Sequence, residues 1–169
     1  LLRRVGSTIA AGKATAEKML GEWRDLDALA SGREADDDSD DPHVGDLSRT
    51  LTAAERALLQ QFVDALAAFR EPDPKYARVL ECLRQRNWFS RGCIIFSQYY
   101  DSVRWLADQL VADFPGAPIA IYAGAGKSAV FKDGAFRSAD REDIKAAVRQ
   151  GRLRLVLGTD AASEGLNLQ

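Results

Sequence analysis

The chain has 169 residues, of which 46% are hydrophobic and 28% are charged. This size and composition are typical of one ordinary globular domain, or of a small domain with an appendage, and two complete domains would be cramped. No apolar run approaches the roughly 20 residues of a membrane helix, and the first residues do not resemble a signal peptide, so we expect a cytoplasmic protein. Cys82, Cys93 and His43 are too few for a disulfide framework or a zinc site, and we expect both cysteines to be buried apolar residues.

The charge of the chain is unevenly distributed. Residues 34–41, with the sequence EADDDSDD, carry six negative charges, and without them the net charge of −2 becomes +4. A weak positive excess permits contact with nucleic acid but does not require it.

The first 72 residues are predicted to be helices around a flexible linker. Residues 1–30 are expected to form a helix. Residues 31–48 combine Gly, Pro, Ser and the acidic run, which predicts an acidic flexible linker. The alternative for this segment is a surface that binds a basic partner. Residues 49–72 are expected to hold an amphipathic helix, since Thr52 and Glu55 have the spacing of a capping box. Its predicted apolar stripe is Leu58, Leu59, Phe62, Val63, Leu66 and Phe69.

Residues 73–169 alternate between helical and strand patterns. Helices are expected at 74–86, 100–114 and 138–150, and strands at 93–96, 118–122 and 153–159. Alternation of this kind predicts an α/β fold with a parallel sheet covered by helices on both faces. Ligands of such sheets bind beyond the carboxyl ends of the strands, so the turns that follow the three strands are expected to meet at one edge.

The turn at residues 124–128, GAGKS, partly matches a P-loop. The P-loop spacing would place its first glycine at Ile121, and the next glycine, Gly134, follows too soon for the helix that a P-loop opens. Both features argue against a nucleotide cradle, although a free-standing P-loop hydrolase remains an alternative. Lys127 then has two open interpretations, a charge beside a nucleic-acid backbone or an ordinary loop lysine.

Three stretches carry a resemblance to a known family. GCIIFSQYYDSVRWLADQL (92–110), YAG (122–124) and REDIKAAVRQGRLRLVLGTDAASEGLNLQ (141–169) resemble the second RecA-like lobe of superfamily two helicases. The similarity is greatest to the double-stranded DNA translocases that include chromatin remodellers and the bacterial RNA-polymerase-recycling translocase. It covers about residues 74–169, and 159–169 match the family's motif V most specifically.

The resemblance implies a partial RecA-like lobe at 73–169, with its sheet truncated at the carboxyl terminus, that grips a nucleic-acid strand and forms one wall of an ATP site between two lobes. The residues it assigns to nucleic acid are Ser97, Gln98, Gly124 and Thr159, and those it assigns to the nucleotide are Glu164, Gly165 and Asn167. A threonine hydroxyl and nearby backbone amides suit phosphate, while the asparagine amide suits a ribose.

The family pattern also implies parts that this sequence lacks. The first lobe and the arginines of motif VI are absent, so we expect a fragment that is inactive alone, taken from a parent that hydrolyses ATP with Mg²⁺. Its expected partners are the missing first lobe and DNA, duplex more than single strand, with RNA as an alternative. A non-enzymatic module that binds nucleic acid or protein is the other open interpretation.

Aromatic residues flank the first strand, and two roles are open for them. Trp88, Phe89, Tyr99 and Tyr100 are either platforms on which bases stack or anchors in the core, and the core role is favoured because aromatics beside strands usually bury their rings.

Overall fold

The computed structural model describes residues 2–29, 52–69, 71, 73–124 and 126–160. The chain divides into two compact units, residues 1–71 and 72–169. No helix in these described ranges is long and apolar enough to cross a membrane.

The first unit contains the helices α1 (Leu2–Ser7), α2 (Ile9–Leu29) and α3 (Ala53–Ala68). The single helix predicted for residues 1–30 is therefore interrupted at Thr8. Its hydroxyl accepts a hydrogen bond from the backbone N–H of Ala11 at 3.0 Å, which satisfies one of the free donors at the start of a helix. Thr8 thus starts α2 as a new helix.

The capping box at the start of α3 is confirmed. The Thr52 hydroxyl accepts from the Glu55 N–H at 3.2 Å, and the Glu55 carboxylate accepts from the Thr52 N–H at 2.8 Å.

The apolar stripe of α3 is narrower than predicted. Leu59 and Val63 are buried against Ala16 of α2, with Phe62 packed beside them. Leu58, by contrast, is 65% exposed. The 3.6-residue period identified the helix, but the neighbouring helix covers only its central positions.

The second unit is an α/β structure with a five-stranded mixed sheet among its described residues. Its elements are α4 (Pro74–Arg84), α5 (Trp88–Arg91), β1 (Cys93–Ser97), α6 (Tyr100–Asp113), β2 (Ile119–Tyr122), β3 (Ala129–Lys132), β4 (Ala135–Ser138), α7 (Arg141–Arg149) and β5 (Leu155–Thr159). The strand order is β1-β5-β2-β3-β4, in which β1, β5 and β2 are parallel and β3 and β4 are antiparallel to their neighbours.

The prediction of a wholly parallel sheet was wrong for residues 129–138, which form a hairpin at the edge of the sheet. Asp133 and Gly134 join β3 to β4 with φ angles of 52° and 82°. Positive φ at both central residues suits the right-handed twist of the strands, and Asp-Gly is a favoured dipeptide for such turns. That dipeptide was the available signal for the hairpin.

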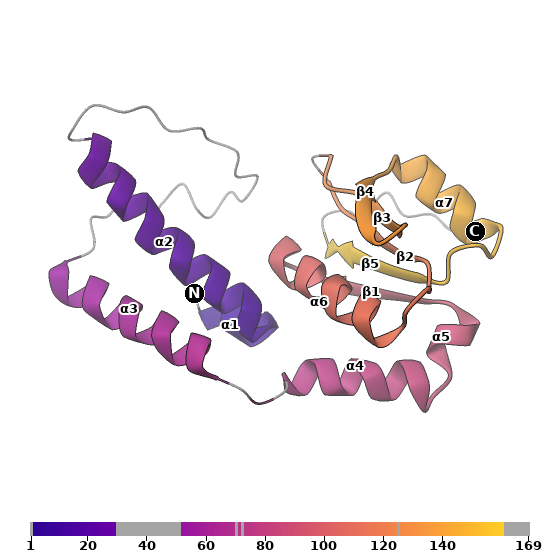
Figure 1. Ribbon diagram of the computed structural model, residues 1–169, viewed down its shortest axis with the longest axis horizontal. Helices are drawn as coiled ribbons and strands as arrows, with labels where there is room; N and C mark the ends of the chain where they lie inside the picture. The colour runs from indigo at the N-terminus through magenta and orange to yellow at the C-terminus, as the bar shows by residue number, and fades with distance from the viewer. Residues whose placement is uncertain (1, 30–51, 70, 72, 125, 161–169) are drawn as a thin grey trace. The chain divides into compact units, whose positions relative to one another are not determined.

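Strands β2 and β5 are buried on both faces, as predicted, whereas β1 is half-buried and its Phe96 is 43% exposed. Ile95, Leu157 and Ile121 pack in one cluster with the α6 residues Val103, Leu106 and Leu110. Their sequence neighbours Val156 and Ala120 point the other way and pack with Ile144 of α7. The sheet of this unit therefore lies between α6 and α7 (Figure 1). Each fully buried leucine or isoleucine contributes about 1.5–3 kcal/mol, so these two clusters fix the strand ends in place.

A polar clamp holds α4 against the end of α6. The Tyr76 hydroxyl donates to the Asp113 carboxylate, whose other oxygen accepts from Arg84 at 2.7 Å. The Tyr76 ring also meets the edge of Trp105 with 5.7 Å between centroids. Burial and the bond to Asp113 raise the pKa of Tyr76 above its ordinary value, and the same bond lowers the pKa of Asp113.

Candidate nucleic-acid interface at the carboxyl ends of the strands

The carboxyl ends of β1, β5 and β2 lie at one edge of the sheet. Ser97 at the end of β1 is the register partner of Thr159 at the end of β5, and Tyr122 at the end of β2 is the partner of Gly158. The predicted meeting of the three strand ends is confirmed. We call this edge the carboxyl edge.

Thr159 is the least accessible of the four residues predicted to bind nucleic acid. It is 8% exposed, whereas Ser97 and Gly124 are half-buried and Gln98 is exposed.

Ser97 and Gln98 occupy the turn between β1 and α6. The Ser97 hydroxyl accepts from the Tyr99 N–H at 3.4 Å, and this short link is typical of a turn that leads into a helix. The exposed Gln98 side chain is therefore the more available donor for a ligand at this turn.

The turn after β2 does not form a P-loop. Ser128 is buried, and its hydroxyl accepts from the Ala123 N–H at 3.0 Å and donates to the Ala123 carbonyl at 2.8 Å. The Lys127 N–H donates to the Gly124 carbonyl at 3.0 Å. These bonds close a tight turn that enters strand β3, where a P-loop would require a helix.

Lys127 connects two of the strand ends. It is exposed, and its Nζ lies 5.5 Å from the centroid of the Tyr100 ring at the start of α6, within the range of a cation–π contact. No ion pair joins it to a carboxylate among the residues that the structure describes. The sequence alone gave no reason to pair Lys127 with Tyr100, because they lie on different turns.

Two of the aromatic residues beside β1 have the predicted core role. Tyr100 and Phe89 pack against the core cluster under α6, and Phe89 also stacks on Phe114 with 5.0 Å between centroids. Trp88 is 43% exposed. The core role is thus confirmed for Tyr100 and Phe89.

The charges near the carboxyl edge are mixed. Lys127 and Arg141 are the cations in this region, but Asp101, Asp140 and Asp160 begin or follow the same turns. Asp140 caps α7 by accepting from the Glu142 N–H at 2.7 Å. Because three carboxylates accompany two cations among these residues, net charge does not favour a phosphate chain here, and hydrogen bonds would supply the affinity for one.

The residues assigned to the nucleotide, Glu164, Gly165 and Asn167, lie outside the described residues, as does the predicted linker at 31–48. Within the described part of the chain, no group of three His, Cys, Asp or Glu residues could hold a metal ion.

Comparison with known proteins adds no relative. A scan against models of protein families finds no match, and a search of curated proteins finds no similar sequence.

Proposed function

We propose that this chain is the nucleic-acid-gripping part of an ATP-dependent nucleic-acid translocase or helicase, and that its second unit is a partial RecA-like lobe. One observation carries the proposal. Residues 159–169, which resemble motif V, begin at the end of β5, and Thr159 lies there beside Ser97, which the same resemblance assigns to the nucleic acid.

In this proposal, one strand of nucleic acid runs along the carboxyl edge. Gln98, Thr159 and the backbone around Gly124 bind successive phosphates or sugars, which fixes the position of the strand without reading its sequence. The ATP cycle of an accompanying lobe in a longer protein supplies the opening and closing that moves the strand. In this proposal the lobe binds the nucleic-acid strand.

A protein-binding module with no enzymatic role is the second candidate, and the mixed charge of the carboxyl edge favours it. The two candidates differ in their response to salt. Binding to phosphates releases counterions, so the affinity for DNA falls steeply as salt rises, whereas a protein-binding module shows no affinity for DNA.

The test is fluorescence anisotropy of labelled duplex DNA with the whole chain at several salt concentrations. Gln98→Ala and Thr159→Ala each remove one hydrogen bond of about 0.5–1.5 kcal/mol, so we expect the Kd to rise about 2- to 13-fold for each. Thr15→Ala, in the other unit, is the matched control and leaves the Kd unchanged. In a longer protein that contains both lobes, Thr159→Ala is expected to reduce DNA-stimulated ATP hydrolysis.

DNA binding that is unaltered in both Gln98→Ala and Thr159→Ala argues against the carboxyl edge as the interface. Because Thr159 is buried, thermal unfolding of that variant is measured alongside, and the exposed Gln98 keeps the test valid if Thr159→Ala unfolds.

A further inference from the structure

A hollow of about 410 Å³ lies at the opposite edge of the sheet, where β1 and β5 begin. Residues 90–94 form one wall, the end of α7 forms another, and the start of β5 forms the third. The five-residue length of β1 separates it from the carboxyl edge. It is therefore a site distinct from the proposed nucleic-acid interface.

The floor of the hollow is apolar. Ile94 of β1, Val156 of β5 and Val148 of α7 line it, and Leu153 is buried beside them. β1 is the outermost strand at this end of the described sheet, so Ile94 stays half-buried at the margin of the cluster under α7. A hollow of this volume with an apolar floor falls within the size range of small-molecule sites, about 300–1,000 Å³.

The rim of the hollow is cationic. Arg91 and Arg154 belong to its lining, which contains no acidic residue. Arg154 is held in place, because its Nη1 donates to the Ser90 carbonyl at 3.0 Å. The adjoining stretches 84–92 and 149–154 hold six arginines between them and no Asp or Glu.

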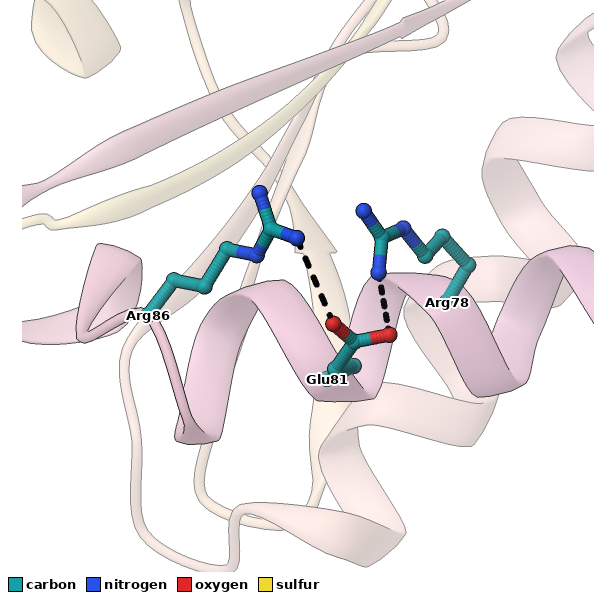
Figure 2. A network of polar contacts seen from close by, with 3 residues as sticks. All are labelled: Arg78, Glu81 and Arg86. Atoms are coloured by element: carbon teal, nitrogen blue, oxygen red, sulfur yellow. Dashed lines mark hydrogen bonds and ion pairs between the residues drawn. The ribbon is translucent and has the colours of Figure 1, made fainter.

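The arginines of α4 and of the turn after it are paired with carboxylates, unlike the two at the hollow. On α4, Glu81 accepts from Arg78 and, at 3.5 Å, from Arg86, which Figure 2 shows, and the bond from Arg78 lowers the pKa of Glu81. In the described part of the chain, no ion pair joins Arg91 or Arg154 to a carboxylate. Positive charge without a neutralising carboxylate is thus concentrated at the hollow.

The end of α7 opposes this charge only weakly. The carbonyls at the end of a helix are partially negative, but those of Val148 and Ala147 accept from the N–H groups of Gly151, at 2.9 Å, and Leu153, at 3.2 Å. With these carbonyls hydrogen-bonded, the guanidinium groups set the sign of the local potential.

We propose that the hollow binds a small organic anion. Its carboxylate, sulfonate or phosphate group meets Arg91 and Arg154, and its apolar body lies on Ile94, Val148 and Val156. Arginine suits the charged end, since its planar guanidinium donates two parallel hydrogen bonds to such groups. A ligand that lacks either the anionic group or the apolar body contacts only part of the site and binds more weakly.

Two probes that differ by one group test this. The probe 8-anilinonaphthalene-1-sulfonate has an apolar body and a sulfonate, and N-phenyl-1-naphthylamine has the same body without the sulfonate. With the whole chain, fluorescence titration is expected to show saturable binding of the sulfonate probe at one site, at least 10-fold tighter than the neutral probe.

Variants then locate the site. Arg91→Gln and Arg154→Gln are each expected to lower the affinity for the sulfonate probe at least 5-fold and to leave the affinity for the neutral probe unchanged. Ile94→Glu places a carboxylate on the floor and is expected to abolish binding of both. Arg78→Gln, which removes a paired arginine of α4, is the matched control and changes neither affinity.

Equal affinity for the two probes, or sulfonate binding that is unchanged in Arg91→Gln, overturns the proposal. Arg154→Gln also removes the bond to Ser90, so the thermal midpoint of this variant is compared with that of the wild type. Arg91 makes no such bond in the described structure, so Arg91→Gln alone tests the proposal if Arg154→Gln unfolds. A third outcome also overturns the proposal: duplex DNA displaces the sulfonate probe from the wild type but not from Arg91→Gln. The hollow would then be a contact for nucleic acid.

Discussion

Phe96 on β1 and Gly158 on β5 are register partners, and the Phe96 ring fills the space that a side chain at position 158 would need. A Cβ placed on Gly158 would lie 2.7 Å from Cε1 of that ring, well inside van der Waals contact. Packing against this ring therefore favours glycine at the position before Thr159.

The first prediction follows from this contact. Gly158→Ala is expected to lower the free energy of unfolding by about 1 kcal/mol, at the lower end of overpacking costs of about 1–3 kcal/mol, because Phe96 is 43% exposed and its ring can shift. Urea unfolding measures the change. In a Phe96→Ala background the same substitution should cost far less; an equal cost in both backgrounds would show that the ring is not the cause.

Much of the second unit could be predicted because its signals are local. The alternation of apolar and amphipathic stretches identified α6, α7 and the three parallel strands, and their parallel direction placed the strand ends at one edge. The capping residues of α3 likewise identified its start, since Thr52 and Glu55 interact over only three positions. Local chemistry of this kind is visible in a single sequence.

The parts that were missed depend on contacts between distant residues. Leu58 is exposed although its neighbour Leu59 packs against α2, and Lys127 meets Tyr100 only because two turns converge. The basic hollow joins residues 90–94 to 148–156, which no local pattern connects. The hairpin at 129–138 is different, because its Asp-Gly turn was a local signal that the expectation of a parallel sheet overrode.

The clamp between α4 and α6 predicts how stability responds to acid. The pKa of Asp113 is lower in the folded chain than in the unfolded chain, chiefly through the bond from Tyr76. The stabilisation is therefore present above the unfolded value of about 3.9 and is lost as the pH falls through the folded pKa. Asp113→Asn should be less stable than the wild type at pH 7, and the two should converge near pH 2 in urea unfolding. Asp108→Asn, on the same helix, is the control; a gap for Asp113→Asn that persists undiminished at pH 2 contradicts the assignment.

Tyr76 predicts the opposite response in alkali. Its folded pKa is raised, mainly by burial, so its contribution is fully present below the unfolded value of about 10 and is lost as the pH rises towards the folded pKa. Tyr76→Phe removes this titration, and its stability should fall less steeply than that of the wild type between about pH 9 and 11. Parallel curves for the two proteins would show that the phenol does not titrate with folding.

Lys127 offers a test that separates its two interpretations. If it contacts a phosphate in the proposed complex with DNA, Lys127→Gln should reduce the slope of log K against log salt by about 0.9, the value for one phosphate contact. Lys132→Gln, an exposed lysine at the far end of β3, is the matched control and should leave the slope unchanged. Equal slopes for the wild type and Lys127→Gln identify an ordinary loop lysine.

The same substitution at two glycines should act in opposite directions. Gly134 has a φ of 82°, and nothing lies within 4 Å of a Cβ placed there, so Gly134→Ala acts through the backbone alone and should destabilise the hairpin by about 1 kcal/mol. Gly21 lies inside α2 with no positive φ and equally open space, so Gly21→Ala should stabilise by about 1 kcal/mol through helix propensity. Thermal unfolding of the two variants measures both signs; a loss of stability at both positions would mean that side-chain crowding, rather than backbone conformation, determines the effect.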